Sequence, residues 1–148
     1  MTRVHAVRVR NGTRKLNKIV KSFKGPSKVK VGFPQGATAS EILDKAVYNE
    51  FGTYNIPERP FLRNALRDGT PEIKRAARRI ALRIFDGRLT AQQGLDQLGI
   101  LAKGLIQDSI TDLRDPPNAA TTIGTKGSSN PLIDSGEMRG AVTWKVDT

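Results

Sequence analysis

Apolar residues at helical spacing mark several stretches of the chain as helices that bury one face. Near the N-terminus, Leu16, Ile19 and Phe23 lie three or four positions apart, with Lys and Arg on the opposite side. The Asn-Gly pair at 11–12 is a turn signal, so this short basic helix is expected to begin after it and to stop at Gly25.

The middle of the chain is predicted to be helical as well. A hydroxyl residue followed three positions later by Glu or Gln, at Thr38 with Glu41 and at Thr90 with Gln93, indicates two capped helix starts. Two further helices are each expected to open at a proline, in the first turn where proline is tolerated. The expected helices cover about 38–51, 60–66, 70–86 and 90–112.

Two segments alternate between apolar and polar residues, as strands with one buried face do. The first is 28–33, and the second is 138–146, in which Trp144 is the largest residue and the expected anchor. The two segments are about 100 residues apart, so they are expected to meet in one small antiparallel sheet that the helices cover.

Residues 114–131 are rich in Pro, Gly, Ser, Thr and Asn and lack an apolar period, which predicts a long loop. Loops of this length in small domains are usually functional or disordered. The expected fold class is therefore α+β, with several amphipathic helices packed on a small antiparallel sheet and a long C-terminal loop before the last strand. The predicted organisation is a basic arm with a short helix over 1–27 and a single α+β domain over 28–148.

The net charge of +11 is concentrated at one end of the chain. Residues 1–30 carry ten Lys and Arg and no acidic residue, whereas the remaining residues are nearly neutral. This arm lacks the motifs that recognise a specific DNA sequence. Its positive charge therefore predicts nonspecific contact with DNA or with an acidic protein surface. The residues expected to make that contact are Arg8, Arg10, Arg14, Lys15, Lys18 and Lys21.

The residue inventory argues against an enzyme. The chain has no cysteine, and its only histidine, His5, lies in the basic arm. Neither a phosphate-binding glycine loop nor a metal-ligand spacing is present, so no catalytic residue, metal or cofactor is predicted. No apolar run reaches the 18 to 20 residues or so of a membrane span, so we expect a soluble chain made in the cytoplasm.

Asp108, Asp112 and Asp115 lie at or just beyond the C-terminal end of the last long predicted helix. Acidic residues there oppose the helix dipole, which costs about 0.3 to 1 kcal/mol each when they are exposed. Two interpretations remain open: a solvated acidic end, or an acidic surface that meets a basic partner such as the arm of a neighbouring copy.

Several short segments resemble, in the same order, the tail-completion and neck proteins of tailed phages, including the head-tail joining and minor tail families of long-tailed phages. The segments are KVGF at 30–33, NEFGT at 49–53, IPERPFL at 56–62, PN at 117–118 with Thr121 or Thr122, KGSS at 126–129 and PLIDSGEMR at 131–139. The resemblance covers about 28–146 and leaves the N-terminal arm out.

This resemblance implies a protein without catalysis or cofactor that forms a ring on the virion axis, between the portal or stopper and the tail tube. Six copies are the usual expectation for such a ring. Its implied partners are other copies of itself and neighbouring neck, stopper or tail-tube proteins, with possible nonspecific contact with passing DNA and no membrane. It implies localisation at the virion head-tail junction, after assembly in the host cytoplasm. The alternative is a nonspecific DNA-binding or DNA-packaging accessory protein that uses the basic arm.

The resemblance and the loop prediction together indicate which residues would contact other subunits or partners. The predicted contact residues are Pro57, Arg59, Pro60, Phe61, Asn118, Thr122, Lys126, Asp134 and Arg139. Two roles stay open for Phe61, which the rigid proline segment could present to the core or to a neighbour.

The acidic residues near this proline segment are expected to form ion pairs. Glu50 and Glu58 could pair with Arg59 and Arg63, within one subunit or between subunits. The loop over 115–131 is expected to be mobile in the free protein and to become ordered on assembly.

Overall fold

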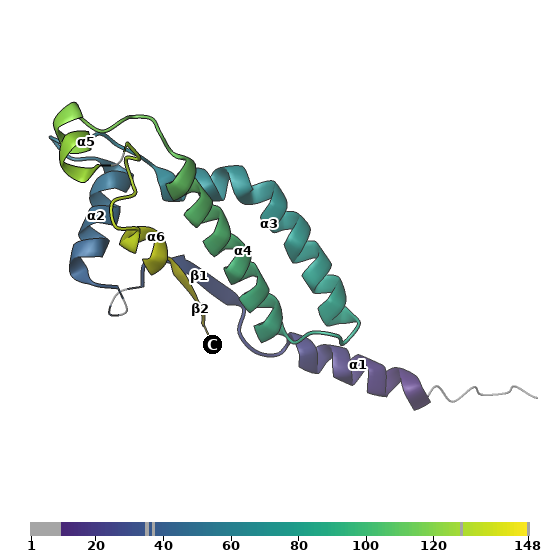
Figure 1. Cartoon of the computed structure of the whole chain (residues 1–148). Helices are drawn as coiled ribbons and strands as arrows, with labels where there is room; N and C mark the ends of the chain where they lie inside the picture. The colour runs from purple at the N-terminus through teal and green to yellow at the C-terminus, as the bar shows by residue number, and fades with distance from the viewer. Residues whose placement is uncertain (1–9, 35, 37, 128, 148) are drawn as a thin grey trace, which may run out of the picture.

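Two long antiparallel helices form the centre of the protein in the computed structural model, which describes residues 10–34, 36, 38–127 and 129–147 (Figure 1). They are α3 (Phe61–Phe85) and α4 (Ala91–Asp112). The capping box predicted at the start of α4 is confirmed: the Thr90 hydroxyl accepts from the Gln93 N–H, and the Gln93 side chain accepts from the Thr90 N–H. α4 therefore begins where the sequence predicts.

α3 runs without interruption through Pro71, so the prediction of two separate helices on either side of it is wrong. Pro71 has no N–H to donate, and the hydroxyl of Thr70 bonds to the Leu66 carbonyl oxygen at 2.7 Å rather than capping a new helix. The buried residues Gly69 and Ala76 lie seven positions apart, which keeps one helix face continuous across the proline. Tertiary packing of this face outweighs the local cost of the proline.

The two strands pair as predicted. β1 (Lys28–Gly32) and β2 (Thr143–Asp147) form a two-stranded antiparallel sheet in which Val31 lies opposite Trp144. α4 packs against both strands, and the Trp144 indole lies so close to Gly99 that a β-carbon there would be 2.3 Å from it. Helices packed on a small antiparallel sheet confirm the α+β class.

Four shorter helices complete the described chain: α1 (Arg10–Phe23), α2 (Ser40–Phe51), α5 (Ala120–Lys126) and α6 (Glu137–Ala141). α1 projects beyond the sheet at one end of the molecule, and α2, α5 and α6 gather at the other end (Figure 1). No helix in the described ranges combines the length and the apolar character that crossing a membrane requires.

The start of α1 and the start of α2 differ from the prediction. α1 includes residues 11–12, so the Asn-Gly pair is part of a helix and not a turn. α2 begins at Ser40 after Ala39, without a side-chain cap, because the Thr38 N–H bonds to the Pro34 carbonyl oxygen and places Thr38 in the preceding turn. The predicted end of α2 is confirmed by Gly52, whose φ of +73° suits glycine.

The C-terminal third also contains more helix than predicted. α5 lies inside the segment predicted as a loop and ends at Lys126, followed by Gly127, whose left-handed φ of +67° closes the helix. α6 replaces the first part of the predicted strand over 138–146. Met138 and Val142 are both buried while Gly140 between them is exposed, which fits the period of a helix and not the alternation of a strand.

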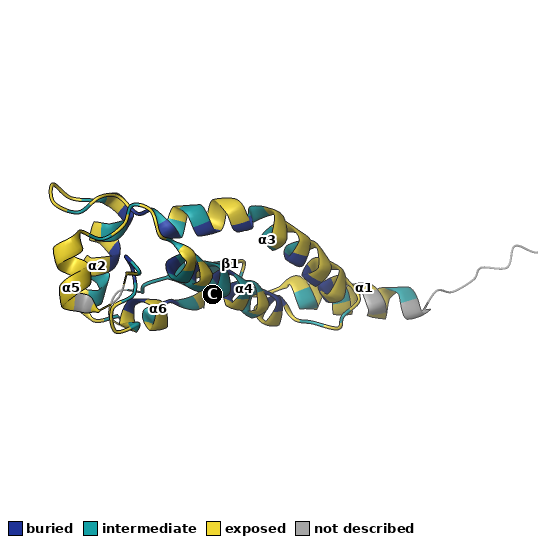
Figure 2. Ribbon diagram, turned by 45° about the horizontal axis from the view of Figure 1, so that its top comes forward, coloured by how far each residue is buried: buried dark blue, intermediate teal, exposed yellow. Residues whose placement is uncertain are grey.

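The main core lies where the first half of α3, the second half of α4, α2 and α6 converge (Figure 2). Its buried members are Ala46, Phe61, Ala65, Ile106, Ile110, Leu132, Met138 and Val142. Phe61 is 1% exposed, and Phe33 packs its ring edge-on against it. Phe61 therefore has the core role, one of the two that the sequence left open.

Candidate functional site

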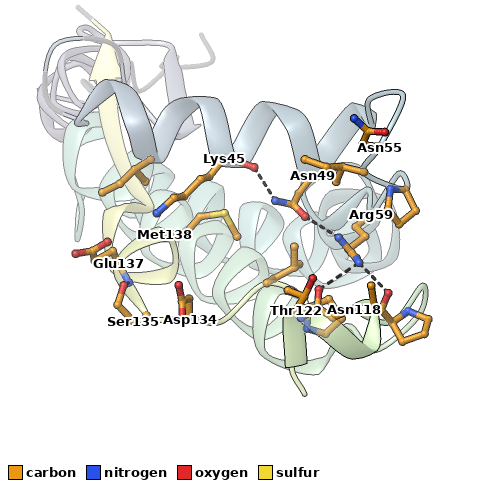
Figure 3. A pocket seen from close by; sticks show the side chains of 18 residues that line it. Lys45, Asn49, Asn55, Arg59, Asn118, Thr122, Asp134, Ser135, Glu137 and Met138 are labelled. Carbon is orange, nitrogen blue, oxygen red and sulfur yellow. Dashed lines mark hydrogen bonds between the residues drawn. The ribbon is translucent and has the colours of Figure 1, made fainter. Parts of the chain in front are cut away.

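Arg59 is a buried arginine in the extended segment between α2 and α3, and it joins two distant parts of the chain (Figure 3). Its Nε donates to the Pro116 carbonyl oxygen at 2.8 Å, and its Nη2 donates to the Pro117 carbonyl oxygen at 2.9 Å and to Asn118 Oδ1 at 3.4 Å. Its Nη1 donates to Asn49 Oδ1 at 3.1 Å. Arg59 thus fixes the start of the 116–127 segment against the end of α2.

The oxygens that accept hydrogen bonds from the Arg59 guanidinium are all uncharged carbonyl or amide oxygens. In the described part of the chain no carboxylate lies within ion-pair distance of its guanidinium. Burial lowers the pKa of Arg59, and the carbonyl and amide dipoles that surround the guanidinium stabilise its charged form. The expected ion pair between Arg59 and Glu50 or Glu58 is therefore absent from the described residues.

Glu50 instead binds backbone N–H groups at the start of α3. This buried carboxylate accepts the backbone N–H of Leu62 at 2.8 Å and that of Arg63 at 3.1 Å. It also accepts the Arg63 Nε at 2.9 Å, and Glu58 binds the same guanidinium. The hydrogen bond to Glu50, and to a lesser extent the one to Glu58, raises the pKa of Arg63. The predicted acid-base pairing thus forms within one chain, through Arg63.

A cleft of about 740 Å³ opens beside Arg59. Its walls are α2, the segment 55–59, the chain from 117 to 122 and the turn that leads into α6 (Figure 3). Its charged residues apart from Arg59 are Lys45, Asp134 and Glu137, and the rest of the lining mixes apolar side chains with amides and hydroxyls. Such a lining can bind an extended peptide through both backbone hydrogen bonds and apolar contacts.

Five of the nine predicted contact residues line this cleft. They come from three separate segments of the chain, and the structure brings them together: Pro57, Arg59, Asn118, Thr122 and Asp134. The segments 56–62, 117–122 and 131–139, which the resemblance singled out, therefore meet at one place.

The other four predicted contact residues lie outside the cleft. Phe61 is in the core, and Pro60 precedes the first residue of α3. Arg139 is exposed on α6, where its Nε donates to the Thr111 hydroxyl at 3.0 Å. Lys126 is the last residue of α5, and its side chain lies outside the described residues.

Five of the six residues predicted to contact DNA lie on α1, at the other end of the molecule (Figure 1). Arg14, Lys18 and Lys21 are exposed and line a shallow hollow between α1 and the start of α4. Arg8 lies outside the described residues, as do the side chains of Arg10 and Lys15. The structure thus separates the two predicted sets of residues.

Asn130 is a residue of this region that the sequence analysis did not single out. Its Oδ1 accepts the N–H groups of Leu132 and Ile133, and its Nδ2 donates to the Thr111 carbonyl oxygen at 2.9 Å. Its own carbonyl oxygen accepts from Asn118 Nδ2 at 3.4 Å. Asn130 holds the cleft wall against α4, and the Asn-Pro pair that it forms with Pro131 was the available turn signal.

The acidic residues of the described chain do not gather into a metal site: no group of three or more His, Cys, Asp or Glu is placed to hold an ion there. Comparisons with protein-family models, with curated proteins and with solved structures found no match to this chain.

Proposed function

We propose that this chain is a structural protein of a tailed-phage virion that assembles as an oligomeric ring at the head-tail junction, where it completes the tail or joins it to the neck or portal. The observation that carries the proposal is the convergence of the resembling segments on the cleft beside Arg59. Three segments that are far apart in the sequence, 56–62, 117–122 and 131–139, meet there and supply five predicted contact residues.

The cleft is suited to a protein partner because side-chain hydrogen bonds tie down both ends of the segment 115–131, which is expected to be mobile in the free protein. Arg59 and Asn130 hold the 116–131 segment by side-chain bonds to backbone groups, and Glu50 fixes the start of α3. A segment whose ends are already held loses less conformational entropy when it binds. The partner expected in the cleft is an extended segment of a neck, stopper or tail-tube protein.

Assembly of the purified full chain tests this proposal. Size-exclusion chromatography with light scattering and negative-stain electron microscopy would be applied to the chain alone and to the chain mixed with phage tails that lack their completion protein. The expected result is a closed ring, or density added at the head-proximal end of the tail. A chain that stays monomeric and leaves the tails unchanged would contradict the proposal.

A nonspecific DNA-binding function is the second candidate, favoured by the exposed cations Arg14, Lys18 and Lys21 around one hollow of α1. Neutralising several phosphates makes affinity fall steeply with salt concentration. Fluorescence anisotropy with a random-sequence duplex at increasing salt measures this slope. Tight binding with a steep slope, together with no effect on tails, would favour this candidate over the ring.

A further inference from the structure

The second half of α3 exposes a row of cations on the side that faces away from α4 (Figure 2). On the inner side of this half, Ile80 and Ile84 are buried and lie against Gly94 of α4. The cations of the outer side are all exposed: Lys74, Arg75, Arg78, Arg79 and Arg83. We name these five residues the α3 cationic row.

The charge of the row is not balanced by the described part of the chain. No carboxylate there lies within ion-pair distance of any of the five cations. The first half of the same helix differs, because Arg67 pairs with Asp68 at 2.8 Å. Glu72 precedes the row, and Asp86, which pairs with Arg88 at 3.9 Å, follows it. The positive charge of the row is therefore available to a partner.

The row is unfavourable for α3 on its own. Like charges four positions apart weaken a helix, and the row contains three such pairs, at 74 and 78, at 75 and 79 and at 79 and 83. The helix dipole favours cations in the last turn, which includes Arg83 but none of the other four. A polyanion that neutralised the row would remove this repulsion.

The make-up of the row fits phosphate groups better than a protein surface. Between Lys74 and Arg79 the row leaves no exposed apolar side chain, since Ala76 is buried and Ala77 is half-buried. Protein interfaces have an apolar centre from which charged residues are depleted. Four of the five cations are arginines, whose planar fork of donors matches a phosphate.

The row also fits duplex DNA better than a single strand. Proteins that bind single strands stack the bases on aromatic side chains, and the segment 74–83 contains no aromatic residue. From residue 74 to residue 83 the helix rises about 14 Å, along which one strand of a duplex carries about four phosphates. Five cations over this length can therefore follow one strand of the backbone.

We infer that the α3 cationic row binds the phosphate backbone of duplex DNA, without recognising a particular sequence. α1 contacts the end of α3, and its exposed cations around the hollow beside Thr90 extend the positive surface from there. The inference does not rest on ring formation, because a single chain carries the whole row. It gives DNA a site on the folded domain, outside the N-terminal arm.

Equilibrium binding to a duplex tests the inference with the full chain. The anisotropy of a labelled random-sequence duplex is measured at increasing NaCl concentration for the wild type and for Arg75→Gln with Arg79→Gln. Each lost phosphate contact lowers the slope of log K against log salt by about 1, so this variant should lose about 2 from the wild-type slope. Its affinity at low salt should fall at least tenfold. An unchanged slope would overturn the inference.

A matched control removes the same charge elsewhere on the surface. Arg67→Gln with Arg114→Gln also replaces two exposed arginines, one paired with Asp68 and the other bonded to the Thr111 carbonyl oxygen. The control should keep the wild-type slope. An equal loss of slope in the two variants would show that net charge alone matters, and would overturn the inference.

Two further measurements separate a lost contact from a damaged fold. Arg75→Lys with Arg79→Lys keeps both charges and should keep the slope. The Gln variant should melt no lower than the wild type, because it removes a like-charged pair from the helix. A lower melting temperature would show that the row stabilises the chain itself, and would contradict the unbalanced charge on which the inference depends.

The contribution of α1 is measured in a Lys18→Gln, Lys21→Gln background. In this background, replacement of Arg75 and Arg79 by Gln should still lower the slope by about 2. A slope that depends on Lys18 and Lys21 alone would place the DNA on α1 and reject the site on α3.

Competition with unlabelled polyanions identifies the partner. Duplex DNA should displace the labelled duplex at a lower concentration of charge than single-stranded DNA or poly-glutamate does. Stronger competition by single-stranded DNA would reject the duplex as the partner. Stronger competition by poly-glutamate would indicate an acidic protein surface in place of phosphate, and would also reject the inference.

The outcomes separate this inference from the proposed function. A chain that forms rings and attaches to tails but does not bind the duplex would reject the DNA site and leave the proposed function standing. A chain that binds the duplex through the α3 cationic row but forms no ring would support the site and reject the proposed function.

Discussion

The Nε of Arg59 donates a hydrogen bond to the carbonyl oxygen of Pro116, 57 residues later in the chain, at 2.8 Å. This bond and its neighbour to Pro117 join the segment after α2 to the segment after α4. Both partners are backbone carbonyls, so the interaction depends on the path of the chain and not on the identity of the acceptor side chain. The cleft exists because Arg59 holds its two walls together.

Arg59→Ala should lower the free energy of unfolding by roughly 2 to 4 kcal/mol, because it leaves the carbonyl oxygens of Pro116 and Pro117 without their charged donor. Arg59→Lys should recover only a small part of the loss, since one ammonium cannot reproduce the planar fork of donors. Urea denaturation followed by circular dichroism measures both variants. Arg88→Ala, at an exposed ion pair with Asp86, is the control and should change stability by less than about 1 kcal/mol.

Glu50→Gln should destabilise the fold by about 1 to 3 kcal/mol. The buried carboxylate accepts two backbone N–H groups at the start of α3 and the Arg63 guanidinium, and an amide offers one acceptor oxygen in place of two. Glu58→Gln is the matched control, because Glu58 binds the same arginine from an exposed position. Equal effects of the two substitutions in thermal denaturation would show that burial of Glu50 contributes nothing.

Gly99→Ala should destabilise the fold by about 1 to 3 kcal/mol, because its β-carbon would lie 2.3 Å from the Trp144 ring. Trp144 is the only tryptophan, so its fluorescence should shift to longer wavelength as the ring moves towards water. Gly104→Ala, in the same helix with open space around it, should stabilise the protein by about 0.5 to 1 kcal/mol. Similar behaviour of the two variants would argue against the contact of Gly99 with Trp144.

Replacement of residues 119–129 by two glycines should leave the chain folded and prevent its attachment to tails. The ends of the replaced segment are already close, since Asn118 Nδ2 lies 3.4 Å from the Asn130 carbonyl oxygen. The bonds from Arg59 to 116–117 remain in this variant, so its melting temperature should stay within a few degrees of the wild type. Normal attachment of the folded variant would show that this segment makes no partner contact.

The ion pair of Lys30 with Asp147, at 2.6 Å across the sheet, should make stability depend on pH in the acid range. The hydrogen bond from Lys30 holds the pKa of Asp147 below its usual value, so the pair stabilises the folded state above about pH 4. This contribution is lost as the pH falls through the lowered pKa of the folded state. The difference in melting temperature between wild type and Asp147→Asn should therefore be present at pH 7 and vanish near pH 2. In a Lys30→Ala background the effect of Asp147→Asn should be much smaller, because only the weaker influence of Lys145 and Lys28 on Asp147 remains.

Local patterns were sufficient for most of the elements. The capping pair of Thr90 with Gln93, the alternation over 28–33 and the stripe that ends at Phe51 each correspond to an observed element. Each of these signals acts within a few residues, so no distant contact is needed to interpret it. The same reasoning failed at Pro71, where packing along the whole length of α3 overrides a local breaker.

The candidate site was less accessible to sequence reasoning. The segments that form it were identified, and the pairing of Glu50 with Arg63 was among those expected, but the hydrogen bonds of Arg59 and Glu50 to backbone groups were not predicted. A backbone carbonyl leaves no mark in the sequence that would indicate its donor. The role of Asn130 was not predicted either, because its side chain also binds a distant backbone carbonyl, that of Thr111.

The sequence by itself determined the α+β class, the sheet that joins 28–33 to the last strand and the concentration of positive charge in the first 30 residues. These properties follow from periodicity and composition. Only the tertiary structure decided that Phe61 belongs to the core, that Arg59 closes one wall of a cleft and that α1 and α2 expose apolar faces at opposite ends. The reason is that burial and hydrogen-bond partnership depend on which distant segments meet, and that is settled only when the whole chain has packed.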